Sequence, residues 1–123
     1  MKAISIQQPW AWLIVNGYKD IENRSWSTKM RGPVLIHASK KADYSAVQTH
    51  RLKDDILAIL AQNKLSINDL PHGGLVGSAS IVDCVTSHHS EWFEGEHGFV
   101  LAYPQLIEFT PCKGKLNFFK VDL

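Results

Sequence analysis

Residues 7–26, QQPWAWLIVNGYKDIENRSW, join a short apolar run, a glycine turn and a charged run, and this segment decides the fold. Pro9 suits the first position of a helix, where its missing N–H and fixed φ cost nothing. Gly17 suits the left-handed residue just past a helix end. Trp10, Leu13 and Ile14 share one helical face, and the other side is apolar too. The pattern predicts a short helix enclosed within the domain.

The charged run places Lys19, Glu22 and Arg24 close to apolar anchors such as Ile21. Charges near low-dielectric surroundings need partners. In an ideal strand Glu22 and Arg24 would share one face and Lys19 the other, so Lys19 joins them only if the chain still turns after the glycine. Two interpretations stay open, namely an ion-pair network at a sheet edge and a functional site.

Further motifs follow in order along the chain. They are Gln8–Ala11, Gly17–Trp26, Arg31–Gly32 leading into Ile36–Lys40, Gly73–Gly77, Trp92 with Gly98–Leu101, and Pro111 with Lys113–Gly114. This series resembles the activating signal cointegrator homology (ASCH) domain, within the pseudouridine synthase and archaeosine transglycosylase (PUA)-like superfamily. The resemblance covers essentially the whole chain. It implies a β-barrel with helices at its side and an RNA-related role, sometimes attached to transcription coactivators.

The remaining segments predict many short strands with glycine bends and early helices. The expected elements are strands at 2–6, 32–39, 75–85, 98–103 and 106–109, a last strand at 119–123, and a long helix from Asp43 to about Gln62. Gly77 interrupts the period-2 pattern where a bulge could reset it. We expect an α+β fold, a small mixed PUA-like β-barrel with helices packed at its side, as a single domain over residues 1–123.

Composition narrows the class of protein. The 123 residues contain no apolar run near the roughly 20 residues that span a bilayer, and the N-terminus lacks a basic region followed by an apolar one. We therefore expect a cytoplasmic protein without a membrane partner. Cys84 and Cys112 are expected as free core thiols in a reducing compartment.

Charge is segregated along the sequence although the net charge is only +1. Residues 24–53 hold seven Lys or Arg against one acid, and residues 83–108 hold five acids and no Lys or Arg. One interpretation is a positive face that attracts phosphates. The other is that the two segments interleave in the fold and cancel.

Lys19 is the foremost candidate for chemistry. Burial beside Arg24 would lower its pKa toward a base or nucleophile, whereas Glu22 would oppose that shift. The resemblance implies an enzymatic alternative, because a bacterial branch of the family hydrolyses the acetyl group of acetylcytidine with a lysine that matches Lys19 and a threonine three positions later. This chain has Glu22 there, which can act as a general base but cannot replace a hydroxyl nucleophile. If the protein is an enzyme, Lys19 and Glu22 are the expected catalytic residues.

Aromatic and basic residues indicate binding instead. A tryptophan beside a cation can stack a base while the cation meets phosphate. Trp10 is either such a ring or a core residue, whereas Trp26 and Trp92 are expected to be exposed platforms. The other candidate binding residues are Arg24, Arg31, His37, Ser39 and Lys40. His37 could equally be a satisfied, half-buried histidine.

Two other sites are rejected. The 73–77 segment lacks the lysine and hydroxyl of a phosphate-binding loop and precedes a strand. Cys84 and the nearby histidines match no zinc-binding pattern, so we expect no metal and no cofactor. The favoured function is binding of RNA or a modified nucleoside through a basic cleft beside the barrel. The alternatives are a hydrolase on RNA or a modified nucleoside, such as a ribonuclease or an acetylcytidine amidohydrolase-like enzyme, and a protein-interaction module.

Overall fold

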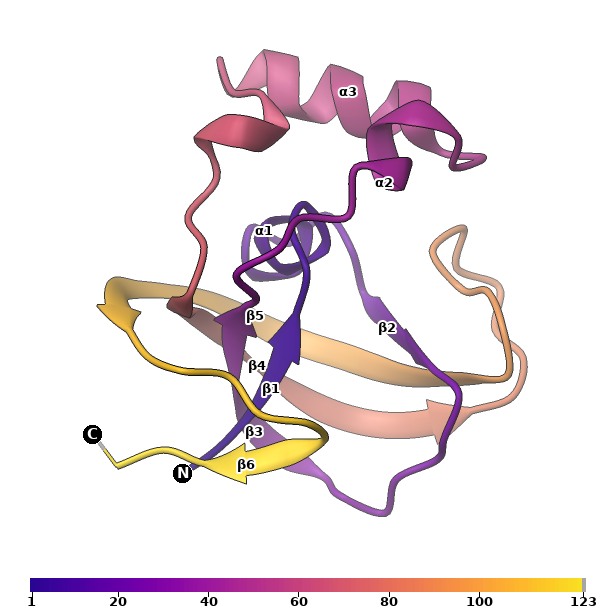
Figure 1. Cartoon of the computed structure of the whole chain (residues 1–123). Coiled ribbons are helices and arrows are strands. Elements are labelled where there is room, and N and C mark those ends of the chain that lie inside the picture. Colours follow the sequence, from indigo (N-terminus) through magenta and orange to yellow (C-terminus); the bar gives the residue numbers. More distant parts are fainter. Residues whose placement is uncertain (123) are drawn as a thin grey trace.

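The computed structural model describes residues 1–122, and the chain alternates strands with short helices (Figure 1). The elements are β1 (Lys2–Ile6), α1 (Trp10–Val15), β2 (Ile21–Arg24), β3 (Gly32–Ala38), α2 (Ser45–Gln48), α3 (Lys53–Gln62), the 3₁₀ turn η1 (Ile67–Asp69), β4 (Gly74–Val85), β5 (His97–Pro111) and β6 (Phe118–Lys120). The last strand, predicted at 119–123, is β6 and ends at Lys120, whereas Leu123 lies outside the described residues. Within residues 1–122, no helix combines the length and the apolar character needed to cross a membrane.

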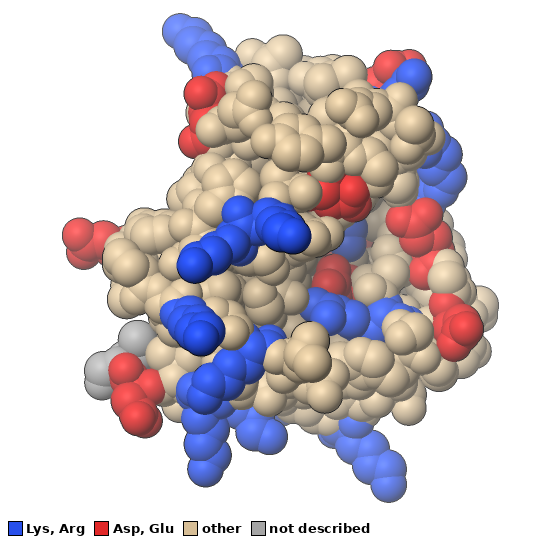
Figure 2. Space-filling model, viewed as in Figure 1, with Lys and Arg blue, Asp and Glu red and all other residues tan. Residues whose placement is uncertain are grey.

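The strands form one mixed sheet in the order β2-β5-β4-β3-β1-β6. β1 and β3 run parallel and the other neighbours run antiparallel. The sheet curls into a half-barrel, α1 lies against it, and α2 and α3 form a further layer beyond α1 (Figure 1). The α+β class and the small PUA-like barrel with helices at its side are confirmed. The space-filling view from the same side shows a hollow between the helical layer and the sheet (Figure 2).

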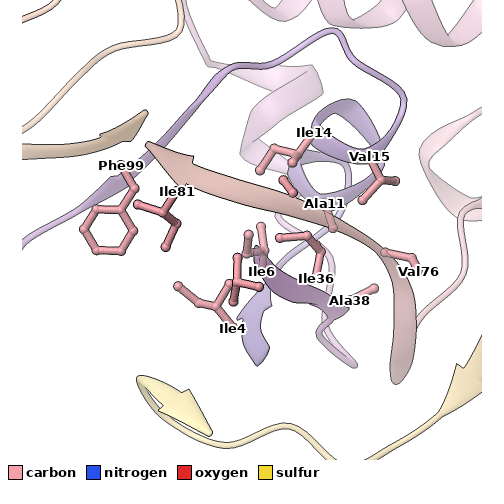
Figure 3. Packing of buried hydrophobic residues seen from close by; sticks show 12 residues of the cluster. Ile4, Ile6, Ala11, Ile14, Val15, Ile36, Ala38, Val76, Ile81 and Phe99 are labelled. Atoms are coloured by element: carbon pink, nitrogen blue, oxygen red, sulfur yellow. The ribbon is translucent and has the colours of Figure 1, made fainter. Parts of the chain in front are cut away.

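The main core lies between α1 and the sheet. Ala11, Ile14 and Val15 of α1 meet apolar side chains from β1, β3, β4 and β5 (Figure 3). The opposite side of α1 is also covered, because Leu13 joins a second buried cluster with Ile56 of α3. Burial on both sides confirms the predicted enclosed helix, and it fixes the platform from which the next turn starts.

The long strands β4 and β5 bend because their pairing is irregular. The register of β4 against β5 shifts at three places, one of them between Leu75 and Gly77. The bulge expected near Gly77 is therefore confirmed. The two strands predicted at 98–103 and 106–109 are one strand, β5, in which Tyr103 adopts a positive φ of 53°.

The long helix predicted from Asp43 to Gln62 is wrong in one respect, because it is two helices. Asp43 Oδ1 accepts hydrogen bonds from the backbone N–H and hydroxyl of Ser45, which opens only the short α2. His50 Nδ1 then accepts a hydrogen bond from the backbone N–H of Leu52. Such a side-chain bond offers the backbone an alternative to the helical pattern, and α3 begins afresh at Lys53.

Candidate functional site

The turn between α1 and β2 brings Lys19 to Glu22. Gly17 has a φ of +83°, and the backbone N–H groups of Tyr18 and Lys19 both donate to the carbonyl of Leu13. The chain is therefore still turning at Lys19. Its Nζ lies 3.6 Å from Glu22 Oε1, while Arg24 Nε donates a hydrogen bond of 2.9 Å to Glu22 Oε2. Arg24 Nη2 donates to the carbonyl of Ser5.

This charged trio is largely withdrawn from water. Lys19 is 5% exposed and Glu22 8% exposed. Lys19 Nζ donates to the carbonyl of Ile21 and lies 5.5 Å from the centre of the Trp10 ring. Desolvation lowers the pKa of Lys19 below its ordinary value, and the neighbouring Glu22 carboxylate opposes that shift.

The trio lines a pocket of about 480 Å³, here called the tryptophan pocket. Its other walls come from β1, α1, the segment before α2, and the loop before β5. The lining residues are Ser5, Ile6, Gln7, Trp10, Lys19, Glu22, Asn23, Arg24, Ser25, Trp26, Asp43, His50 and Glu94. Positive and negative side chains therefore face each other across this pocket.

Asp43 orients one wall of the tryptophan pocket. Its Oδ2 accepts a hydrogen bond from Trp10 Nε1 at 2.9 Å, which fixes the plane of that ring. Partial burial acts to raise the pKa of Asp43, but the hydrogen bonds from Ser45 and Trp10 outweigh it and lower that pKa. Asp43 is thus held as a carboxylate.

A second pocket, of about 570 Å³, adjoins the first and is here called the basic pocket. The two share Ser5, Arg24 and Trp26 as a common wall. Its other lining residues are His37, Ser39, Lys40, Gly73, Cys112, Lys113, Gly114, Lys115, Leu116 and Asn117. Four cations line it, and among residues 1–122 no aspartate or glutamate does.

Most of the predicted site residues fall in these two pockets. Trp10, Lys19 and Glu22 line the tryptophan pocket only. His37, Ser39 and Lys40 line the basic pocket only. Arg24 and Trp26 line both. In place of the single basic cleft that the sequence predicts, these residues line two adjoining pockets.

One predicted placement is wrong, and a second predicted residue lies away from both pockets. Trp92 is not an exposed platform, because it is 6% exposed and packs in the second core cluster with residues such as Leu13 and Ile21. Arg31 lines neither pocket. It donates to the carbonyls of Thr28 and Met30 and lies 3.7 Å from Asp83.

Several residues that line the two pockets were not predicted from the sequence. In the sequence, Asp43 marks only the start of the predicted long helix, and His50, Lys113 and Lys115 are not among the predicted binding residues. The pair of lysines around Gly114 was the one available sequence pattern, since a glycine between cations suits close approach to an anion. Among residues 1–122, no group of three His, Cys, Asp or Glu side chains is gathered as a metal site.

The segregation of charge along the sequence is only partly retained in the folded structure. Bases of the 24–53 segment meet acids of the 83–108 segment, because Arg31 pairs with Asp83 and His50 Nε2 lies 2.8 Å from Glu94. Arg51 also reaches Glu94, at 4.0 Å. Acids and bases interleave over part of the face in Figure 2, and four cations still gather at the basic pocket.

The half-barrel, its enclosed helix and the neighbouring pockets define a PUA-like domain. Comparison with known proteins gives the family: residues 4–122 match the ASCH domain, and the chain belongs to that family. Its members are generally associated with RNA binding. Activating signal cointegrator 1 of Homo sapiens is 30% identical over 128 residues, and its Mus musculus counterpart gives the same figure. That match covers 97% of this chain but only 22% of either relative.

Proposed function

We propose that this chain binds RNA or a modified nucleoside, with a base in the tryptophan pocket and phosphate at the basic pocket. The observation that carries the proposal is the contrast in charge between two pockets that share one wall. Ser5, Arg24 and Trp26 belong to both. One nucleotide therefore spans them with its base on one side and its phosphate on the other.

The tryptophan pocket suits a base because it combines rings with polar groups of both kinds. Unstacked bases bind proteins by stacking on aromatic rings and by hydrogen bonds along their edges. Trp10 and Trp26 supply the rings. Glu22 and Asp43 supply acceptors for the amino and imino groups of a base, and Lys19 is a donor.

The basic pocket suits phosphate because Lys40, Lys113 and Lys115 line it and no acid among residues 1–122 does. Arg24 also lines it but is paired with Glu22. Lys19 is instead assigned to the base, because Glu22 lies beside it. Arg31 is removed from the phosphate contacts, since it pairs with Asp83.

The test is a titration of the protein with a short, labelled, mixed-sequence single-stranded RNA, followed by fluorescence anisotropy at several salt concentrations. Lys40→Gln and Lys113→Gln should each weaken binding, and each should reduce the magnitude of the salt slope by about 0.7. Lys53→Gln is the matched control, because Lys53 is exposed on α3 and lines neither pocket. Equal slopes in all four proteins would contradict the proposal, and absence of salt-dependent binding would favour a protein-interaction module.

A hydrolase acting on a modified nucleoside is the second candidate function, and one observation favours it. Lys19 is buried beside the Glu22 carboxylate, and desolvation lowers its pKa. A lysine of that kind can act as a base or a nucleophile. Incubation with acetylated cytidine, read by mass spectrometry, should yield cytidine with the parent protein and none with Lys19→Ala. Unchanged acetylcytidine with both proteins would exclude this activity for that substrate.

A further inference from the structure

We propose that Ser5 is a nucleophile activated by His37, and that the basic pocket takes carboxylic esters that carry a negative charge. This activity is separate from nucleoside binding and from any chemistry of Lys19. It would place a second kind of reaction at the wall common to the two pockets, where Ser5 lies.

The sheet itself brings the two side chains together. Ser5 of β1 and His37 of β3 are direct partners in the parallel pairing of these strands. Ser5 Oγ lies 2.9 Å from His37 Nδ1, and His37 Nε2 lies 2.6 Å from the carbonyl oxygen of Cys112. A hydroxyl, a base and a group that orients the base form the arrangement of nucleophilic catalysis.

The direction of each hydrogen bond follows from the partners. The carbonyl of Cys112 can only accept, so His37 Nε2 carries a proton. In the neutral ring Nδ1 is then an acceptor, and the hydroxyl of Ser5 donates to it. The 2.8 Å contact between Ser5 and Ser39 therefore takes its proton from Ser39 Oγ. Ser5 Oγ is thus hydrogen-bonded to a base that is already correctly oriented to remove its proton.

The surroundings hold the Ser5–His37 pair in place and supply positive charge beside it. His37 is only 1% exposed, which holds the imidazole in one orientation. Gly114 packs against the pair so closely that an added Cβ would stand 2.7 Å from His37 Cε1 and 3.0 Å from Ser5 Oγ. The neighbouring Lys113 and Lys115 line the same pocket, where they would attract an anionic substrate and stabilise negative charge on an ester oxygen.

The reaction balances without any further reagent except water. Ser5 Oγ forms a bond to the ester carbonyl carbon as its proton passes to His37 Nδ1. The bond from that carbon to the alcohol oxygen then breaks, and the departing alcohol takes the proton from Nδ1. Water attacks the acyl-serine, gives a proton to Nδ1, and releases the carboxylic acid as that proton returns to Ser5 Oγ.

The test is labelling of the whole protein with a fluorophosphonate, followed by trypsin digestion and mass spectrometry. The sequence is favourable, because cleavage after Lys2 and Lys19 leaves a peptide in which Ser5 is the only serine, while Ser39 falls in the peptide 32–40. Label should appear on Ser5 and disappear in Ser5→Ala. His37→Gln should lower the labelling rate by roughly 100-fold. Ser87→Ala, in an exposed loop, should label at the parent rate.

Substrate charge is tested with two esters of 4-nitrophenol, the acetate and the succinate half-ester. The succinate half-ester should be hydrolysed faster than the acetate, and Lys113→Gln should reduce that preference. Absence of label in the 3–19 peptide, or label that persists there in Ser5→Ala, would overturn the proposal. Neither result decides the RNA-binding proposal, because the anisotropy titration tests that proposal independently. Ser5→Ala removes only one hydroxyl, so the test stands even if His37→Gln fails to fold.

Discussion

At the scale of single residues, the account depends on how Lys19 is held. Its ammonium group has a backbone carbonyl, a carboxylate and a tryptophan ring around it. The sequence predicted the three charges and their apolar neighbours, but not their convergence. In an ideal strand Lys19 would point away from Glu22. Instead the backbone N–H groups of Tyr18 and Lys19 both donate to the Leu13 carbonyl, so the chain is still turning at Lys19. The residue pattern alone does not specify these local bonds.

The lowered pKa of Lys19 predicts a dependence of stability on pH. The unfolded chain binds the proton of Lys19 more tightly than the folded protein does, so the free energy of unfolding rises with pH between the folded pKa and 10.5. The rise is at most about 1.4 kcal/mol per pH unit. Urea unfolding of the parent and Lys19→Met across this interval checks it. Because Lys19→Met lacks the group, its stability should gain less from rising pH, and parallel curves would refute the claim.

Glu22 is predicted to be the counter-charge of the buried Lys19 and the half-buried Arg24. Glu22→Gln should lower the free energy of unfolding by about 3 kcal/mol, because it leaves Lys19 and Arg24 together without a carboxylate. Denaturant unfolding at neutral pH measures the change. Glu108→Gln, an exposed position on β5, is the control and should stay within about 0.5 kcal/mol of the parent. A Glu22→Gln protein as stable as this control would contradict the assigned role.

At the scale of elements, α1 carries Trp10 to the tryptophan pocket and packs closely on β4 at Gly77. The enclosed helix was predictable, because apolar residues occupy both of its sides between a proline and a glycine. The break between α2 and α3 was not, since it depends on a hydrogen bond from Leu52 to the His50 ring rather than on propensity. His50 then faces the tryptophan pocket, which a continuous helix from Asp43 would not have guaranteed.

Gly77 is predicted to be required for the close approach of α1 to β4. A Cβ at this position would stand 2.6 Å from Val15 Cγ1 and would also meet the carbonyl oxygen of Gln105. Gly77→Ala should therefore cost about 2 kcal/mol of unfolding free energy through overpacking. Thermal unfolding followed by circular dichroism measures it, with the adjacent Ser78→Ala as the control. Equal midpoints for the two variants would show that α1 does not rest on this glycine.

At the scale of the whole molecule, distant parts of the sequence line the two adjoining pockets. The turn after α1 supplies Lys19 and strand β2 supplies Glu22 and Arg24, whereas the loop before β6 supplies Lys113 and Lys115. Sequence separation hid this arrangement, and the PUA-like class was accessible only through the order of motifs. The failure at Trp92 has the same origin, because polar neighbours along the chain do not reveal an apolar cluster formed in space.

The most direct measurement of the central claim is an NMR titration that follows the indole N–H signals of the four tryptophans while a short single-stranded RNA is added. Trp10 and Trp26 line the tryptophan pocket, whereas Trp12 stacks on Tyr18 and Trp92 is buried in the core, so two signals report binding and two serve as internal controls. The account predicts that the Trp10 and Trp26 signals shift, whereas the Trp12 and Trp92 signals change little. Unmoved Trp10 and Trp26 signals in the presence of bound RNA, or larger shifts at Trp12, would contradict it.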